Sequence, residues 1–167
     1  PQALDAVMGG RTVGEVVASR NARFAAGDKV AGMGGWQQYA VIDADQGGVL
    51  MKVDATLIPL SAYLGVVGMP GVTAWYGLTQ IIEPKAGETI VVSAASGAVG
   101  SVVGQLAKQL RCRAVGIAGG PEKCRYVVEV LGFDACIDYR QHADPKSLSA
   151  ALKAACPDGI DGNFENV

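Results

Sequence analysis

The sequence predicts an α/β fold in which a doubly wound parallel sheet follows part of a small β-barrel. From Glu88 onward, short apolar strands alternate with helical segments, as in parallel sheets that helices cover on both faces. Before residue 54, short strands are separated by glycine-containing turns, a spacing typical of small barrels. The chain has 167 residues, half of them apolar, which is enough to bury a sizeable core.

The first part of the chain is expected to form short strands over residues 12–18, 29–31, 36–42 and 49–53. Gly27-Asp28 and Gly47-Gly48 mark turns between them. A few strands cannot close a barrel or protect their edges, so this part is expected to be an incomplete barrel. Trp36 and Tyr39 are expected to be core aromatics, because each can bury a large area.

An uncharged stretch over residues 55–82 is long enough to span a bilayer. Pro59, Pro70 and four glycines would interrupt a spanning helix, and no cluster of lysine or arginine flanks one side. We therefore expect this stretch to be a buried crossing between two domains. The first domain is expected over residues 1–67 and the second over residues 68–167.

The second part is expected to contain four strands, over residues 89–93, 114–118, 135–138 and 162–165, and three helices, over residues 98–110, 121–131 and 145–155. Pro121 and Pro145 each stand in the first turn of a helix, where proline is favoured. A doubly wound sheet with strand order 3-2-1-4-5-6 would stop here with its fourth strand at an open edge. The chain is therefore expected to be an internal fragment of a longer polypeptide.

The turn Ser96-Gly97-Ala98-Val99-Gly100 joins the first of these strands to its helix. Glycines at such a turn let the backbone approach a pyrophosphate, and the helix N-terminus attracts its charge. The first glycine of the standard dinucleotide fingerprint is missing, while Gly104 is placed to let helix and sheet approach closely. No Gly-Lys-Ser/Thr follows, which excludes a P-loop, and Ala94 excludes a hydrolase nucleophile elbow. A tight turn without a ligand is the alternative.

The end of the second strand favours NADP(H) over NAD(H). NAD-binding units place an acid there to hold the ribose hydroxyls, but this strand ends in Ile117-Ala118-Gly119-Gly120. Lys123 follows in the first turn of the next helix, a poor place for a cation unless an anion is near. We expect Lys123 to bind a 2′-phosphate; the alternative is a solvated lysine.

Composition narrows the possible partners. The formal net charge of −2 implies no strongly basic face, so a nucleic-acid partner is not expected. The four cysteines form no C-x-x-C pair and the single histidine is His142, so no metal site is expected. The cysteines are expected to be free thiols of a cytoplasmic protein.

Four motifs occur in order along the chain, at residues 68–78, 94–105, 122–123 and 164–167. In these motifs the chain resembles the zinc-independent medium-chain dehydrogenase/reductases, and within them the prostaglandin reductase / leukotriene B4 dehydrogenase branch, which includes bacterial curcumin-reductase-like enzymes. The resemblance covers almost the whole chain. It implies a partial NADP-binding Rossmann domain preceded by part of a GroES-like substrate domain, which residues 27–30 and 35–39 also resemble.

The resemblance further implies a set of cofactor and substrate residues. These are Gly97, Ala98, Val99 and Gly100 at the pyrophosphate, Lys123 at the 2′-phosphate, Tyr139 beside the adenosine phosphate, Asn166 at the end of the fourth strand, Met69 and Thr73 near the nicotinamide, and Met33 in the substrate pocket. The switch point between the first and fourth strands supports Asn166 independently. Tyr139 as an ordinary half-buried tyrosine and Met69 as a packing residue are the alternatives.

By the same resemblance, the full-length protein is an NADPH-dependent reductase of the carbon–carbon double bond in α,β-unsaturated ketones or aldehydes, similar to 2-alkenal and 15-oxoprostaglandin 13-reductases. It is expected to be a cytoplasmic homodimer with a small-molecule enone or enal substrate, no metal and no membrane partner. The family's suggested proton-donor tyrosine belongs to the absent C-terminal part, so no catalytic residue is named in this chain. An NADPH:quinone reductase of the same superfamily and a non-catalytic nucleotide-binding module are the alternatives.

Overall fold

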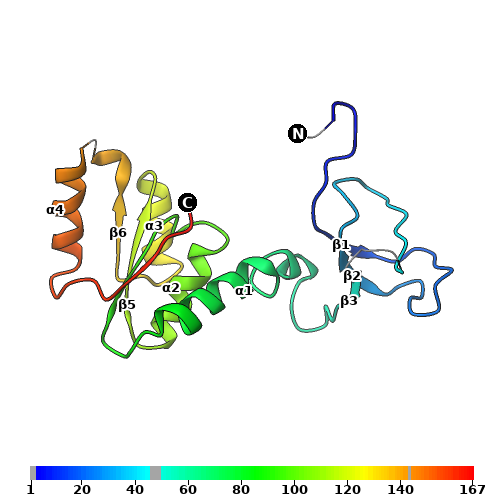
Figure 1. Ribbon diagram of the computed structural model, residues 1–167, viewed down its shortest axis with the longest axis horizontal. Coiled ribbons are helices and arrows are strands. Elements are labelled where there is room, and N and C mark those ends of the chain that lie inside the picture. The colour runs from blue at the N-terminus through cyan, green and yellow to red at the C-terminus, as the bar shows by residue number, and fades with distance from the viewer. Residues whose placement is uncertain (1–2, 46–49, 143) are drawn as a thin grey trace. The chain divides into compact units, whose positions relative to one another are not determined.

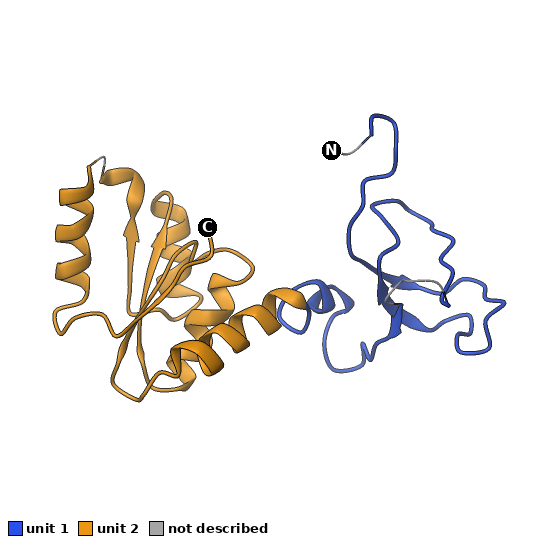
Figure 2. Ribbon diagram, viewed as in Figure 1, with its two compact units in different colours: residues 1–68 blue, residues 69–167 orange. Residues whose placement is uncertain are grey.

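The computed structural model describes residues 3–45, 50–142 and 144–167. The chain divides into two compact units, residues 1–68 and residues 69–167, which Figure 2 shows in blue and orange. Each unit has its own sheet, so each is described by itself.

The first unit contains a three-stranded antiparallel sheet with the order β1-β2-β3. The strands are β1 (Thr12–Glu15), β2 (Lys29–Gly32) and β3 (Met51–Lys52), and all three are short (Figure 1). The core of the unit lies along β2, where Val30 and Ala31 are buried. A 3-10 helix, η1 (Leu60–Leu64), follows the sheet.

Two expectations for the first unit are wrong. Residues 36–42 form a bend followed by irregular backbone, not a strand, after Gly35, which has a φ of 71°. Trp36 and Tyr39 are 66% and 71% exposed and do not belong to the core, because three short strands bury too little surface to cover them. The expected turn at Gly47-Gly48 lies outside the described residues.

Helix α1 (Met69–Tyr76) and the π-helix η2 (Gly77–Ile82) occupy the end of the uncharged stretch. Burial was expected throughout this stretch, but within these two helices only Gly71, Ala74 and Leu78 are buried. Trp75 is 50% and Ile81 70% exposed, because the helices pack against α2 and β7 on one side only. No helix in the described part of the chain is both long and apolar enough to cross a membrane.

The second unit confirms the predicted fold class. Its four-stranded parallel sheet has the order β6-β5-β4-β7. The strand that comes first in the sequence, β4, lies inside the sheet between β5 and β7. The strands are β4 (Thr89–Val92), β5 (Arg113–Ala118), β6 (Ala135–Asp138) and β7 (Gly162–Phe164). The helices that join them are α2 (Gly100–Gln109), α3 (Pro121–Glu129) and α4 (Pro145–Ala155).

Helices cover both faces of this sheet. Val103 of α2 and Val127 of α3 pack with Ile90 and Val92 on one face. On the other face, side chains of α4 such as Leu152 pack with Val91, Val115 and Ile137. Residues of β4 thus reach both cores, and all four of its positions are buried. This strand connects the two layers and sets the position of the turn that follows it.

The structure shows which group lies nearest to Gly104. A Cβ atom on Gly104 would collide first with the ring of Phe133, which follows α3. The small residue therefore makes room for an aromatic ring between α2 and the segment leading to β6. Phe133 is 3% exposed, so its ring has little space into which it could move.

We expect Gly104→Ala to lower the free energy of unfolding by about 1–3 kcal/mol, because overpacking a dense core forces neighbours to shift. Chemical unfolding in urea measures the change. In the double variant with Phe133→Leu, the two effects should be less than additive, since the smaller side chain removes the clash. Gly9→Ala is the control, because a Cβ there meets nothing within 4 Å. Equal losses for Gly104→Ala and Gly9→Ala would contradict the assignment.

Candidate functional site

Four segments follow the carboxyl ends of the parallel strands β4 to β7 and meet at one edge of the sheet. In open α/β sheets, ligands bind outside these strand ends, at the point where the direction of strand order reverses. Here β5 and β7 lie on opposite sides of β4, which puts the reversal between β4 and β7. Most of the expected cofactor residues lie in these four segments.

The turn between β4 and α2 is compact. A Cβ atom on Gly100 would lie 2.5 Å from the carbonyl oxygen of Ala94, so only glycine lets α2 begin this close to the turn. Ala94 itself has a φ of 43°. The N–H of Gly97 donates to the carbonyl of Ala94 at 2.8 Å, and the N–H of Ala95 donates to the carbonyl of Ile117 at 3.0 Å. The second bond fixes the turn to β5.

The turn presents free backbone donors. In the part of the chain that the structure describes, the N–H groups of Ala98, Val99 and Gly100 donate to no protein group. They lie at the N-terminus of a ten-residue helix, where the helix dipole is positive. Such an arrangement can bind a phosphate through backbone hydrogen bonds. The structure thus brings together the four residues expected at the pyrophosphate, and α2 starts two residues later than expected because Ala98 and Val99 belong to the turn.

The tip of β5 carries an aromatic ring. A Cβ atom on Gly119 would lie 2.8 Å from both Cε1 and the hydroxyl oxygen of Tyr139, so the ring lies directly over this glycine. Tyr139 is 49% exposed, which leaves one part of its ring accessible to a ligand. Lys123 is exposed in the first turn of α3, and none of the ion pairs in the described residues involves it.

Arg140 is a second cation at this tip that the sequence reasoning missed. Its Nη1 lies 3.7 Å from the position that a Cβ of Gly120 would take. Like Lys123, it is exposed and takes part in no ion pair among residues 3–45, 50–142 and 144–167. Its position directly after Tyr139 was the available signal, because a residue next to an expected ligand at a strand end is within reach of the same group.

Asp138 connects the tip of β5 to the end of β6. Its carboxylate accepts hydrogen bonds from the N–H of Gly120 at 2.8 Å, the N–H of Arg140 at 3.1 Å and the side-chain amide of Gln141 at 3.0 Å. The bond from Gly120 contributes most to lowering the pKa of Asp138 below its ordinary value. The ionised carboxylate therefore supports the turn that Lys123 follows.

Asn166 is tied to the end of β4. Its side-chain Nδ2 donates to the carbonyl of Ser93 at 2.7 Å, and its backbone N–H donates to the Ser93 hydroxyl at 3.0 Å. The Ser93 hydroxyl in turn donates to Oε1 of Glu165 at 2.7 Å. This bond contributes most to lowering the pKa of Glu165 below its ordinary value, and a bond from the N–H of Val167 contributes next. The sequence reasoning named Asn166 as a site residue but neither Ser93 nor Glu165.

The other expected site residues stand on α1 or in the first unit, outside the four segments that follow the strands. Met69 and Thr73 stand one turn apart on α1, where the Thr73 hydroxyl donates to the carbonyl of Met69 at 2.9 Å. No hydrogen bond in the described residues joins either of them to residues 97–100. Met33 follows β2 in the first unit and is 55% exposed. The roles of these three residues, like those of the other expected site residues, remain predictions.

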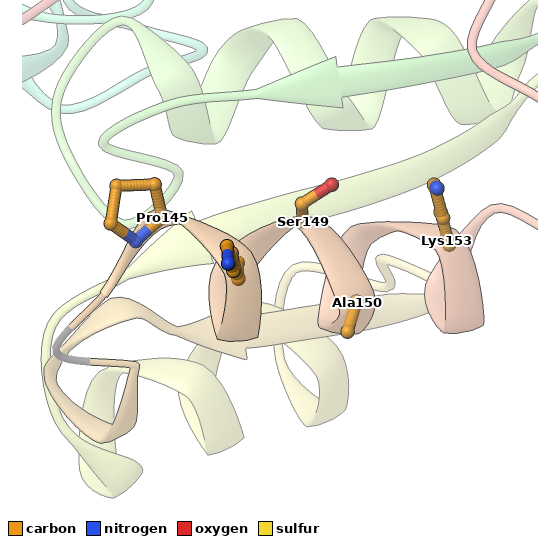
Figure 3. Close-up of a pocket in the computed structure, with 5 residues that line it drawn as sticks. Pro145, Ser149, Ala150 and Lys153 are labelled. Carbon is orange, nitrogen blue, oxygen red and sulfur yellow. The ribbon is translucent and has the colours of Figure 1, made fainter.

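A surface pocket of about 380 Å³ lies along α4 and is lined by Pro145, Lys146, Ser149, Ala150 and Lys153 (Figure 3). It shares no residue with the segments at the strand ends. Within the described residues, no group of three or more histidine, cysteine, aspartate or glutamate side chains could hold a metal ion. The strand-end edge is therefore the candidate site.

Comparison with known proteins identifies similar oxidoreductases. A family model described as the N-terminal domain of oxidoreductase matches residues 1–52. The chain is 49% identical over 167 residues to an NADPH-dependent curcumin reductase of Escherichia coli, covering 100% of this chain and 46% of the relative. It is 48% identical over 158 residues to a 2-alkenal reductase (NADP(+)-dependent) of Nicotiana tabacum, covering 95% of this chain and 45% of the relative.

Among solved structures, the chain is similar to CurA in complex with NADPH from Vibrio vulnificus, with 46% identity and a TM-score of 0.83 over 100% of this chain and 48% of that one. The chain belongs to the zinc-independent medium-chain dehydrogenase/reductase family. As a member of that family, it has part of a GroES-like barrel in its first unit and part of a Rossmann domain in its second. The chain spans about half the length of the curated relatives it matches.

The lowered pKa of Asp138 gives a pH prediction. A carboxyl group whose pKa is lower in the folded state stabilises the fold fully above its unfolded pKa, and this contribution is lost as pH falls through the folded pKa. We expect the Asp138 carboxyl carbon, followed by NMR, to titrate below 3.8 in the folded protein. Its midpoint in the urea-unfolded chain should be higher. Equal midpoints in the two states would show that the bond from Gly120 does not form.

Proposed function

We propose that the protein is an NADPH-dependent reductase of the carbon–carbon double bond in α,β-unsaturated ketones and aldehydes. The observation that carries the proposal is a backbone phosphate cradle beside the tip of β5, where residues 117–120 contain no acid and where Lys123 and Arg140 take part in no ion pair among the described residues. The similarity to an NADPH-dependent curcumin reductase and to a 2-alkenal reductase supports the substrate class.

Each part of the candidate site matches one part of NADPH. The N–H groups of residues 98–100 and the close approach at Gly97 and Gly100 suit the pyrophosphate. Lys123 and Arg140 suit the 2′-phosphate, because charge-assisted hydrogen bonds to phosphate are stronger than neutral ones. Tyr139 offers its ring to the adenosine end of the cofactor. NADH lacks the phosphate that these two cations would bind.

The chain's own residues bind and orient the cofactor and the substrate. When bound, NADPH supplies the hydride that reduces the β-carbon of the substrate. In this proposal, Asn166 holds the cofactor at the end of β7, Met69 and Thr73 lie near the nicotinamide, and Met33 lines the substrate pocket. Residues 1–67 belong to the substrate domain and residues 68–167 to the cofactor domain. None of the residues of this chain is assigned as a proton donor.

The working form in this proposal is a cytoplasmic homodimer of the full-length polypeptide, with a small-molecule enone or enal as its substrate. The balanced charge supports a small-molecule partner, since a net charge of −2 provides no broad basic face for nucleic acid. The relatives named for reductase activities support the same class of substrate.

We expect Lys123→Ala and Arg140→Ala, each made in the full-length protein, to weaken NADPH binding by about tenfold or more, because each removes a charged hydrogen bond to phosphate. NADH binding should change by less than about twofold, as no 2′-phosphate is present. Calorimetric titration of both cofactors measures the two dissociation constants.

Arg125→Ala is the matched control, because Arg125 is also an exposed cation of α3 but lies beyond its first turn. It should change NADPH affinity by less than about twofold, since a surface charge without a close partner contributes little. Equal losses in all three variants would mean that general surface charge, not a defined phosphate site, attracts the cofactor.

The proposed reaction predicts a substrate order. The full-length protein should oxidise NADPH faster with an alkenal or alkenone than with a quinone, as followed by absorbance at steady state. Turnover of the quinone at a comparable or greater rate would favour a quinone reductase. Tight NADPH binding with no oxidation across a panel of enones would favour a nucleotide-binding module without turnover.

A further inference from the structure

Three hydrogen bonds join the residues after β7 to Ser93, the residue that follows β4. Asn166 donates through both its backbone N–H and its side-chain Nδ2, and Ser93 donates its hydroxyl proton to Glu165. Ser93 is 7% exposed, so water competes little for these bonds. The partners lie 72 and 73 positions apart in the sequence, so the bonds hold two separate strand ends together.

The bond to the Ser93 carbonyl decides how the Asn166 amide is oriented. A carbonyl oxygen can only accept, so the amide nitrogen and not Oδ1 must face it. Oδ1 lies on the other side of the planar amide and has no partner in the described part of the chain. Asn166 therefore offers a ligand a hydrogen-bond acceptor, and the ligand group that it binds there must be a donor.

Ser93 and Glu165 fix the backbone on which this amide stands. The Ser93 hydroxyl has one proton, which it gives to Glu165, and its oxygen then accepts from the N–H of Asn166. The same Glu165 oxygen also accepts from the N–H of Val167 at 3.0 Å. The residues on either side of Asn166 are thus held by one carboxylate oxygen.

The order of the strands shows which half of a dinucleotide would lie over Asn166. Lys123 and Arg140 stand at the tip of β5 and the phosphate cradle follows β4, whereas β7 lies on the opposite side of β4. If the 2′-phosphate lies at the tip of β5 and the pyrophosphate lies in the cradle after β4, the nicotinamide half of the cofactor lies over the end of β7. Ribose hydroxyls in that half are donors, whereas ionised phosphates are acceptors only.

We infer that Ser93 and Glu165 are positioning residues that hold the Asn166 amide so that its Oδ1 accepts a hydrogen bond from the nicotinamide ribose of NADPH. This inference rests on the proposed function. Neither positioning residue needs to touch the cofactor. The Ser93 hydroxyl and Glu165 act through the backbone around Asn166, and the Ser93 carbonyl acts on its side-chain amide.

The test compares two ligands of the full-length protein by calorimetric titration. NADPH contains the nicotinamide ribose, whereas adenosine 2′,5′-bisphosphate carries the 2′-phosphate but lacks that ribose. We expect Ser93→Ala and Asn166→Leu each to weaken NADPH binding by about fivefold to tenfold, as for the loss of one hydrogen bond. Binding of the bisphosphate should change by less than about twofold in both variants, since they alter no group near the 2′-phosphate.

Two variants of Glu165 distinguish the loss of the hydrogen-bond acceptor from the loss of the negative charge. Glu165→Leu removes the acceptor and should weaken NADPH binding by about fivefold, whereas Glu165→Gln keeps a side-chain oxygen and should restore most of that loss. Ser149→Ala is the control for the serine variant, because Ser149 is exposed on α4 and lines only the surface pocket of Figure 3.

The outcomes are distinct. Unchanged NADPH affinity in the Ser93 and Asn166 variants, with NADPH still bound by the unaltered protein, overturns the inference and leaves the proposed function standing. Equal losses of both ligands also overturn it, because they show a general collapse of the strand ends. An unaltered protein that binds no NADPH overturns the proposed function, and this inference with it.

Discussion

The burial of β4 between two layers of helices is the constraint on which the rest of the second unit depends. All four of its residues are buried, and they contribute to both hydrophobic cores. Because β5 and β7 pair with its two edges, β4 fixes where the neighbouring strands end. The phosphate cradle, the β5 tip and Asn166 are all placed by this one strand, so a shift of β4 along the sheet would move them together.

Local patterns made most of the second unit predictable. The strand over residues 135–138 and the helix over residues 145–155 have the expected bounds, since an apolar run or a proline in the first turn marks each. The strand order was predictable too, because right-handed crossovers leave few ways to arrange alternating strands and helices. Here the sequence signals lie within a few residues of the structure that they specify.

Features that depend on distant contacts were not predictable. The link from Ser93 to Glu165 and Asn166 spans more than seventy positions, and no local pattern announces it. Arg140 comes close to Gly120 only when β5 and β6 pair. In the first unit, the exposure of Trp36 and Tyr39 reflects how little surface three short strands can bury, which side-chain size alone does not reveal.

Gly119 and Gly120 at the tip of β5 hinder the substitutions that would introduce an acidic ribose ligand there. A carboxylate side chain on Gly119 would have to occupy the space of the Tyr139 ring, and Gly120 has a φ of 100°, a conformation that residues with a side chain rarely adopt. An acid at Gly119 would therefore have to displace the Tyr139 ring, and an acid at Gly120 would strain the backbone. The backbone at this tip thus works against an acidic ribose ligand, in addition to the cations that the proposed NADPH site provides.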